Sequence, residues 1–213
     1  MQWMTDAIYA LRGHHEPPEE KVFYEVLKYI PENATMLELG AYWGYYSLWF
    51  SSTIPGATNY LVEPIFDNLN VGKKNFALNN KEAHFYHAYV AVPGEDGGKD
   101  GVNFPGAKQI LIDSFLRDEN VEHLNILHAD VQGVESDMLL SCVASVKANK
   151  IDYFFISTHT FALHHFCIDF LVENNYIILA EHSPAESCSC DGLVVARRKD
   201  VPGPNHVSIR KYP

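Results

Sequence analysis

The chain has 213 residues, of which 47% are hydrophobic and 20% are charged. This length suits one domain with a single large core, and the composition is that of a globular rather than a disordered protein. Sixteen basic residues against 27 acidic ones give a formal net charge of -11, which argues against a phosphate backbone as partner. No apolar run reaches the roughly 18 residues that a membrane span needs.

The first residues, MQWMTD, lack the basic start and apolar centre of a signal peptide. A cytoplasmic protein with no membrane partner is therefore the default expectation. The four cysteines are sparse, and without a secretory context we interpret them as reduced thiols. The sequence leaves open whether the chain forms a homo-oligomer.

Apolar periodicity predicts strands that alternate with helices along the chain. Residues 19–30 have helical spacing and are stopped by Pro31. A short extended piece at 110–112 enters a helical turn at 113–116. The other strands are predicted at 34–39, 59–62, 83–92, 123–129, 153–157, 176–180 and 192–196, with helices at 45–54, 65–79, 134–148 and 162–174.

The chain is expected to be one domain, because no linker or internal repeat divides it. Residues 1–32 form an N-terminal helical extension, which either serves as a lid over a ligand or simply packs on the sheet. Residues 33–200 form the core, and the proline-containing residues 201–213 form a tail. Residues 93–107 are rich in glycine and proline and are predicted to be a loop or loose hairpin.

Alternating strands and helices predict an α/β fold with three layers, in which a doubly wound, Rossmann-like, mostly parallel sheet has helices on both faces. The last two strands are expected to pair closely, with the final strand antiparallel. In such folds the ligand lies at the carboxyl ends of the strands. The residues that the sequence places there are Glu38, Gly40, Glu63, Tyr89, Asp130 and His159.

The most informative stretch follows the first strand and reads Glu38-x-Gly40-Ala41-x-x-Gly44. Glycines at this point let the backbone approach a ligand closely, although a plain strand-to-helix turn also uses them. Tyr42 stands where a dinucleotide-binding motif has its middle glycine, which disfavours a pyrophosphate and favours a smaller nucleoside. Glu63, 19 residues after Gly44, ends the second strand, where a carboxylate can accept both ribose hydroxyls.

Several blocks of the chain resemble class I S-adenosylmethionine-dependent methyltransferases, and more narrowly the FkbM family. The resemblance covers about residues 34–160, with a weaker match near 191–193, and its most specific part is DVQGVE at 130–135. The chain differs from the usual family pattern at Tyr42-Trp43 and at His128-Ala129, which concerns the methyl acceptor more than the cofactor. The matching blocks are ELGAYWGYYSL at 38–48, VEP at 62–64, NFALN at 75–79, IDSFL at 112–116, ILHADVQGVE at 126–135 and ISTH at 156–159.

This resemblance implies S-adenosyl-L-methionine as cofactor and a hydroxyl of a sugar, glycan or natural product as methyl acceptor. Glu63 would bind the ribose diol, Tyr89 and Val90 would flank the adenine, and Asp130 would lie near the methionine part or the reacting centre. Glu135 is expected to cap the following helix. The remaining cofactor-binding residues implied by the match are Glu38, Gly40, Ala41, Tyr42, Gly44, Ser47 and Pro64.

A hydroxyl must lose its proton before it can accept a methyl group. His159 is the candidate base because an ordinary histidine pKa of about 6.5 suits neutral pH, and Asp130 either orients it or takes the proton itself. A purely structural histidine is an equal alternative. No metal is expected, because the spacing of His159, His164, His165, His182, Cys188 and Cys190 does not match a zinc site.

Two other functions remain open at this point. A nicotinamide-dependent oxidoreductase is disfavoured by the missing middle glycine and by the lack of a substrate domain. A non-catalytic nucleoside-binding interaction domain would use the same cradle, with His159 and Asp130 as structural residues.

Overall fold

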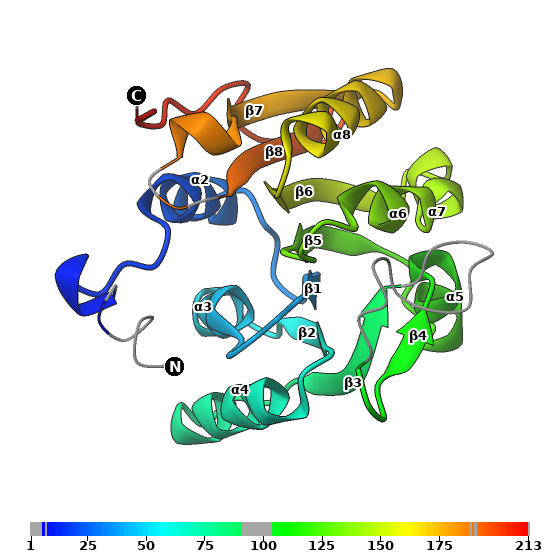
Figure 1. The fold of residues 1–213 in the computed structure, drawn as a ribbon. Coiled ribbons are helices and arrows are strands. Elements are labelled where there is room, and N and C mark those ends of the chain that lie inside the picture. The colour runs from blue at the N-terminus through cyan, green and yellow to red at the C-terminus, as the bar shows by residue number, and fades with distance from the viewer. Residues whose placement is uncertain (1–5, 7, 91–103, 188, 190, 213) are drawn as a thin grey trace.

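The computed structural model describes residue 6, residues 8–90 and 104–187, residue 189 and residues 191–212. Eight strands form one twisted sheet (Figure 1) in the order β4-β3-β2-β1-β5-β6-β8-β7. The strands are β1 (Thr35–Leu39), β2 (Thr58–Glu63), β3 (His84–Val90), β4 (Lys108–Ile110), β5 (Leu124–Ala129), β6 (Ile151–Thr158), β7 (Tyr176–His182) and β8 (Gly192–Arg198).

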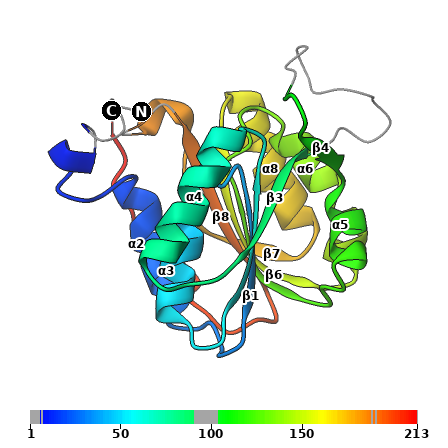
Figure 2. The same cartoon turned by 90° about the horizontal axis from the view of Figure 1, so that it is seen from below.

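Helices cover both faces of this sheet (Figure 2), which confirms the predicted three-layer fold. One face carries α2 (Pro17–Leu27), α3 (Tyr45–Thr53) and α4 (Phe66–Leu78). The opposite face carries α5 (Ile112–Asp118), α6 (Glu135–Leu140), α7 (Val143–Lys147) and α8 (Phe161–Glu173), and a short 3-10 helix, η2 (Pro184–Glu186), follows β7.

Alternation along the strands divides the core between the two faces. In β1, Leu37 and Leu39 belong to the cluster under α5–α8, whereas Met36 belongs to the cluster under α2 and α3. The helices contribute fully buried side chains to these clusters, such as Phe23 from α2 and Phe50 from α3. The sheet is therefore buried on both sides, as a mostly parallel sheet requires.

The prediction of an antiparallel last strand is confirmed. Strand β8 runs antiparallel to both β6 and β7 and lies between them, while the other described pairs are parallel. The order of the strands reverses between β1 and β5, because the chain first builds outward from β1 and then returns to its other side. In folds of this kind, ligands bind at such a switch point, beside the carboxyl ends of the strands, which here are those of β1 and β5.

The predicted single helix over 134–148 is wrong, since the chain forms two short helices, α6 and α7, separated at Ser141 and Cys142. The start of α7 has no side-chain cap of its own. Instead, Asp113 from α5 accepts hydrogen bonds from the backbone N–H groups of Ala144 and Ser145, each at 2.9 Å. This carboxylate stabilises the new helix start through the fold, a contact that local periodicity does not reveal.

The buried face of α3 carries Tyr46 and Phe50. Tyr45 and Trp49 are only partly buried. The apolar and aromatic residues surround this short helix so evenly that spacing alone does not select its inner face.

The N-terminal helix α2 packs on the core through Val22, Phe23 and Val26, which are fully buried. The tail returns to the sheet, where the N–H of Val207 donates to Leu179 O at 2.7 Å. Most of the predicted 93–107 loop and the last two residues of the predicted 83–92 strand lie outside the described residues. Within the described part of the chain, no helix combines the length and apolar character needed to cross a bilayer.

Replacing Asp113 with alanine is expected to lower the free energy of unfolding by about 1–2 kcal/mol, because two N–H groups at the start of α7 lose their acceptor. Urea unfolding measures the change. Asp118→Ala on the same helix is the control: Asp118 pairs only with exposed Arg117, and its loss should cost less than about 0.5 kcal/mol. Equal losses in the two variants would contradict the capping role.

Candidate functional site

The turn between β1 and α3 is held against both neighbouring strands. The N–H groups of Gly40 and Ala41 both donate to Val62 O of β2, at 2.9 and 3.0 Å, while the N–H of Asp130 donates to Leu39 O. Gly40 has a φ of 71°, and a Cβ placed there would lie 1.8 Å from Asp130 O. Only glycine fits between these backbones, so the packing of the turn against Asp130 by itself requires Gly40, and the predicted approach of this backbone to a ligand stays a prediction.

Glu63 holds the next part of the turn in an unusual conformation. Tyr42 has a φ of 46°, a left-handed conformation that costs a bulky residue about 1–2 kcal/mol. Its N–H donates to Glu63 Oε2 at 2.8 Å, and the N–H of Ile65 donates to Glu63 Oε1 at 2.8 Å. A carboxylate oxygen can accept more than one hydrogen bond, so the Glu63 carboxylate keeps acceptor capacity for a ligand hydroxyl.

Glu38 and Ser47 lie beneath the turn rather than on its surface. Both are buried, and the N–H of Ser47 in the first turn of α3 donates to Glu38 Oε2 at 3.0 Å. Gly44, which precedes α3, provides no side-chain cap, so Glu38 caps the helix from the sheet. This contact gives Glu38 and Ser47 a structural task within the predicted cofactor cradle.

The residues predicted around the adenine differ in their surroundings. Val90 is buried in the core cluster under α5–α8, so its side chain packs inside the fold. Tyr89 is half-buried and contacts Phe104, with ring centroids 5.4 Å apart. Pro64 contributes a backbone oxygen that lies 3.0 Å from His87 Nε2. Of the two residues predicted to flank the adenine, Val90 is therefore in the core and Tyr89 is not.

Acidic groups from three segments surround His159, since Asp130 follows β5, Glu135 begins α6 and Asp191 precedes β8. His159 Nδ1 lies 2.6 Å from Glu135 Oε1, and Nε2 lies 3.4 Å from both Asp130 Oδ1 and Asp191 Oδ1. Glu135 is fully buried and also accepts from the N–H of Gly133. The predicted pair of Asp130 and His159 is therefore brought together. The prediction that Glu135 caps the following helix is wrong, because Glu135 is the first residue of α6, makes no side-chain cap there and contacts His159 instead.

This environment changes the proton affinity of His159. Burial disfavours the imidazolium, but the hydrogen bond to Glu135 and the charges of Glu135 and Asp130 outweigh burial and raise the pKa of His159 to about 10. Asp130 is destabilised as an anion by burial, yet its contacts with His159 and Gln132 lower its pKa overall. His159 is thus a cation at neutral pH, and the ordinary pKa on which its role as a base was predicted does not apply in the folded chain.

A second polar group is buried on the α2 side of the sheet. His128 on β5 is the register partner of Glu38 on β1, and its Nε2 lies 2.9 Å from Glu19 Oε1 of α2. Neither of these two atoms has hydrogen-bond geometry with a partner, and burial lowers the pKa of His128. Glu19 is 2% exposed. Its carboxyl group is therefore buried beside β5, the strand that Asp130 follows.

Sequence reasoning missed Glu16, Glu19 and Asp191 as site residues. Their signal was weak, because Glu16 and Glu19 flank two prolines at a helix start and Asp191 follows a serine- and cysteine-rich segment. Cys188 and Cys190 lie outside the described residues. Among the residues that the structure does describe, no group of three histidine, cysteine, aspartate or glutamate side chains is arranged to hold a metal ion.

The fold is shared with solved methyltransferases. A putative rRNA methylase from Clostridium thermocellum superposes with a TM-score of 0.58 at 8% identity, over 87% of this chain and 97% of that one. The chain has the Rossmann-like methyltransferase fold. A putative methyltransferase from Streptococcus mutans in complex with SAH gives 0.58 at 10% identity, over 84% and 97%. M. capricolum TrmK with S-adenosyl-homocysteine gives 0.54 at 12% identity, over 89% and 71%.

No protein-family model matches the chain, and no curated protein matches it at a significant level. The likeness to solved structures is therefore one of fold, and the FkbM resemblance has no support from these comparisons.

Gly40→Ala is expected to lower the free energy of unfolding by about 3 kcal/mol or more, because the added methyl group meets Asp130 O in a left-handed backbone. Urea unfolding measures the effect. Gly106→Ala is the matched control: Gly106 has a φ of 78°, but a Cβ there meets the His87 ring at an ordinary 3.6 Å. Its cost should be only about 1 kcal/mol, and similar costs for both variants would refute the close approach.

The pKa of the His159 ring is expected to be about 10 when followed by NMR across a pH titration. A raised folded-state pKa means that His159 contributes stability fully below its unfolded pKa of about 6.5 and loses this contribution as pH rises through about 10. The stability difference between the wild type and His159→Gln should therefore shrink over this range. A ring that titrates near 6.5 would show that the carboxylates do not hold the proton.

Proposed function

We propose that the protein is an S-adenosylmethionine-dependent methyltransferase. The observation that carries this proposal is the pair of carboxylates, Glu63 and Asp130, on either side of the Gly40 turn at the switch point of the sheet. A nucleoside cofactor with a cationic methionine part suits this acidic edge, whereas the pyrophosphate of a dinucleotide would face carboxylates. The shared methyltransferase fold supports the same choice.

The residues present fit such a cofactor. Glu63 has its carboxylate fixed by two backbone N–H groups and keeps acceptor capacity for the ribose diol. Asp130 remains ionised beside the turn and matches the positive charge of the methionine part. Tyr89 offers an aromatic surface for the adenine. When bound, S-adenosylmethionine supplies an activated methyl group, so the protein itself needs to align the acceptor and accept a proton.

We assign proton acceptance to Asp130 and a positioning role to His159. Asp130 would accept the proton of a hydroxyl acceptor, and the bound sulfonium would supply the methyl group and leave as a neutral thioether. His159, cationic and hydrogen-bonded to Glu135 on one side, would hold the carboxylates of Asp130 and Asp191 on the other. The choice of oxygen rather than nitrogen or carbon as methyl acceptor rests on the FkbM resemblance.

A small molecule or glycan is favoured over nucleic acid as the acceptor. One similar structure is named as a putative rRNA methylase, so RNA deserves comparison. The net charge of -11 and the carboxylates around His159 would repel a phosphate backbone.

Calorimetry with S-adenosylmethionine and NAD tests the cofactor. We expect S-adenosylmethionine to bind and NAD not to bind, and Glu63→Gln to weaken S-adenosylmethionine binding about tenfold or more through loss of a charged hydrogen-bond acceptor. Exposed Glu82→Gln is the control and should bind as the wild type does. Binding of NAD alone would favour an oxidoreductase. Binding of S-adenosylmethionine without methyl transfer to any hydroxyl acceptor would favour a non-catalytic nucleoside-binding domain.

A further inference from the structure

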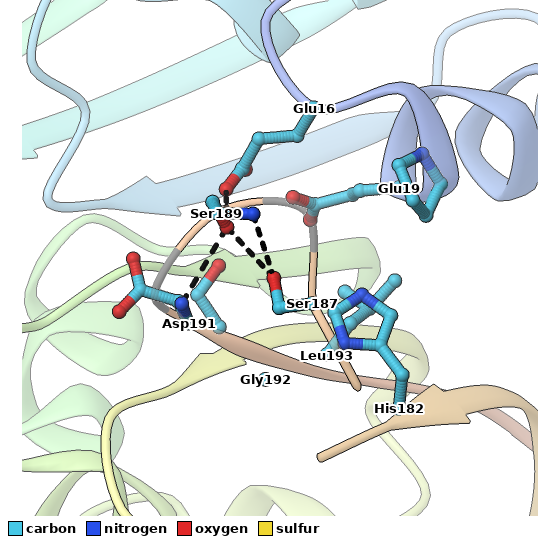
Figure 3. A pocket seen from close by; sticks show the side chains of 10 residues that line it. Glu16, Glu19, His182, Ser187, Ser189, Asp191, Gly192 and Leu193 are labelled. Carbon is cyan, nitrogen blue, oxygen red and sulfur yellow. Dashed lines mark hydrogen bonds between the residues drawn. The ribbon is translucent and has the colours of Figure 1, made fainter. Parts of the chain in front are cut away.

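Two hollows in the described part of the molecule differ in what they can hold. The first lies between the start of α2 and the connection into β8 (Figure 3) and is lined by Glu16, Glu19 and Asp191, among others. It encloses about 10 Å³, which is room for about one water molecule. The second encloses about 230 Å³ and is open to solvent on the outer side of α3. Drug-sized pockets start at about 300 Å³, so the second hollow has room for one ring-sized group and the first does not.

The second hollow is a groove along one side of α3, which we call the α3 groove. Its lining residues are Tyr45, Leu48, Trp49, Ser52 and Asn79. The four residues from α3 are spaced three or four apart and therefore share one side of the helix, opposite the buried side that carries Tyr46 and Phe50. Asn79 follows the last residue of α4, the helix that packs beside α3 on this face of the sheet (Figure 2). The groove thus lies between the two helices and faces away from the sheet.

The lining of the α3 groove combines aromatic rings with neutral hydrogen-bonding groups. Tyr45 and Trp49 are half-buried, and their ring centroids lie 6.3 Å apart in an edge-on arrangement. Ser52 and Asn79 are exposed, and Ser52 Oγ and Asn79 Nδ2 each donate to the main-chain oxygen one turn earlier, at 2.7 and 2.8 Å. The hydroxyl keeps its lone pairs, and the amide keeps one N–H and its oxygen, so both side chains retain capacity for a ligand.

This combination matches the two kinds of surface on a sugar ring. A pyranose with equatorial hydroxyls presents C–H groups on its faces and hydroxyls around its rim. The C–H faces suit the negative face of an aromatic ring, and the hydroxyls suit groups such as those of Ser52 and Asn79. None of the described lining residues is charged, so the groove favours a neutral ring over an ionic ligand.

A run of aromatic rings connects the α3 groove with the turn between β1 and α3. Each ring contacts the next, in the order Trp49, Tyr45, His15, Trp43 and Tyr42. Successive centroids lie 6.3, 6.1, 6.0 and 5.4 Å apart, within the range of aromatic contacts, and all five side chains are half-buried. The last residue of the run donates its N–H to Glu63, so the rings lead from the groove to the proposed cofactor site.

Nucleic acid also stacks on aromatic rings, but each base brings a phosphate with it. Proteins that bind single strands therefore combine such rings with a positively charged groove. None of the described lining residues of the α3 groove is basic, and the ammonium group of neighbouring Lys81 already donates to Ser51 O at 2.8 Å. The net charge of -11 adds to the repulsion of phosphates, which neutral sugar rings do not meet.

We propose that the α3 groove and the run of rings bind a chain of neutral, glucose-configured sugar units, and that this chain carries the methyl acceptor. One sugar ring packs on Trp49 and Tyr45 in the groove, with its hydroxyls toward Ser52 and Asn79. The chain then follows the rings to the Gly40 turn. This inference rests on the proposed methyltransferase function and narrows its acceptor to an extended glycan rather than a free monosaccharide.

Calorimetry with glucose and with cellotetraose, a β-linked chain of glucose units, tests the proposal. We expect cellotetraose to bind at least about tenfold more tightly than glucose, because its further rings contact further aromatic side chains. Trp49→Ala should weaken the binding of cellotetraose about tenfold or more, since the groove loses its largest aromatic surface. Tyr24→Ala removes an aromatic ring that is 55% exposed on α2 and lies outside the groove, and this control should bind as the wild type does.

A second variant separates binding from folding, because Trp49 also packs against Phe23 in the core, with centroids 5.3 Å apart. Ser52→Gln places a longer, uncharged side chain in the groove from an exposed helix position and should weaken the binding of cellotetraose about tenfold by occupying its space. Thr53→Gln is the matched control, since Thr53 is the next exposed residue of the same helix and does not line the groove. S-adenosylmethionine binding and thermal unfolding of each variant are measured alongside.

Wild-type affinity of Ser52→Gln for cellotetraose would overturn the proposal, as would equal affinity for the two sugars or no binding of cellotetraose. Binding of an oligouridine RNA that Ser52→Gln abolishes would assign the groove to nucleic acid instead. Self-association that this variant abolishes would assign it to a second copy of the chain, and either result also overturns the proposal. Failure of the proposed function appears separately, as absence of S-adenosylmethionine binding in the wild type.

Discussion

The site depends on the backbone contact between the Gly40 turn and the strands on either side of it. Val62 O receives two N–H groups from the turn, and Asp130 O occupies the space that a side chain at position 40 would need. The first strand therefore fixes the positions of the ends of β2 and β5 at once. Glu63 and Asp130 follow directly from those ends, so their separation is set by backbone packing and not by flexible side chains.

The same edge carries more buried charge than a core normally tolerates. Glu38, Glu19 and His128 lie beneath α2 and α3 with few partners, and burial raises the pKa of both glutamates while it lowers that of His128. The apolar contacts of α2 compensate for this cost, since Phe23 packs against Tyr46 and Phe155. The N-terminal helix thus belongs to the core through one side and to the acidic edge through its first turn.

Much of the fold followed from the sequence because strand and helix periods alternate clearly, and the glycine turn and Glu63 stand at strand ends. The break between α6 and α7 did not, because the carboxylate that caps the start of α7 belongs to Asp113 on another helix. The proton affinity of His159 was also beyond sequence reasoning, as it depends on burial and on the carboxylates of Asp130 and Glu135, which only the fold brings to it. Glu16 and Glu19 resembled ordinary acids at a helix start, and only tertiary packing shows that they are enclosed.

Because β8 is antiparallel, the connection that leads into it can change in length more freely than the turns after β1, β2 and β5. Because this strand runs against its neighbours, it begins where they end, so the connection between η2 and β8 brings Ser187, Ser189 and Asp191 to this edge of the sheet from the far end of the chain. Its length can vary without altering the register of β1, β2 or β5. A change in the length of this connection would therefore alter the surroundings of His159 while the backbone contacts of the Gly40 turn stay unchanged.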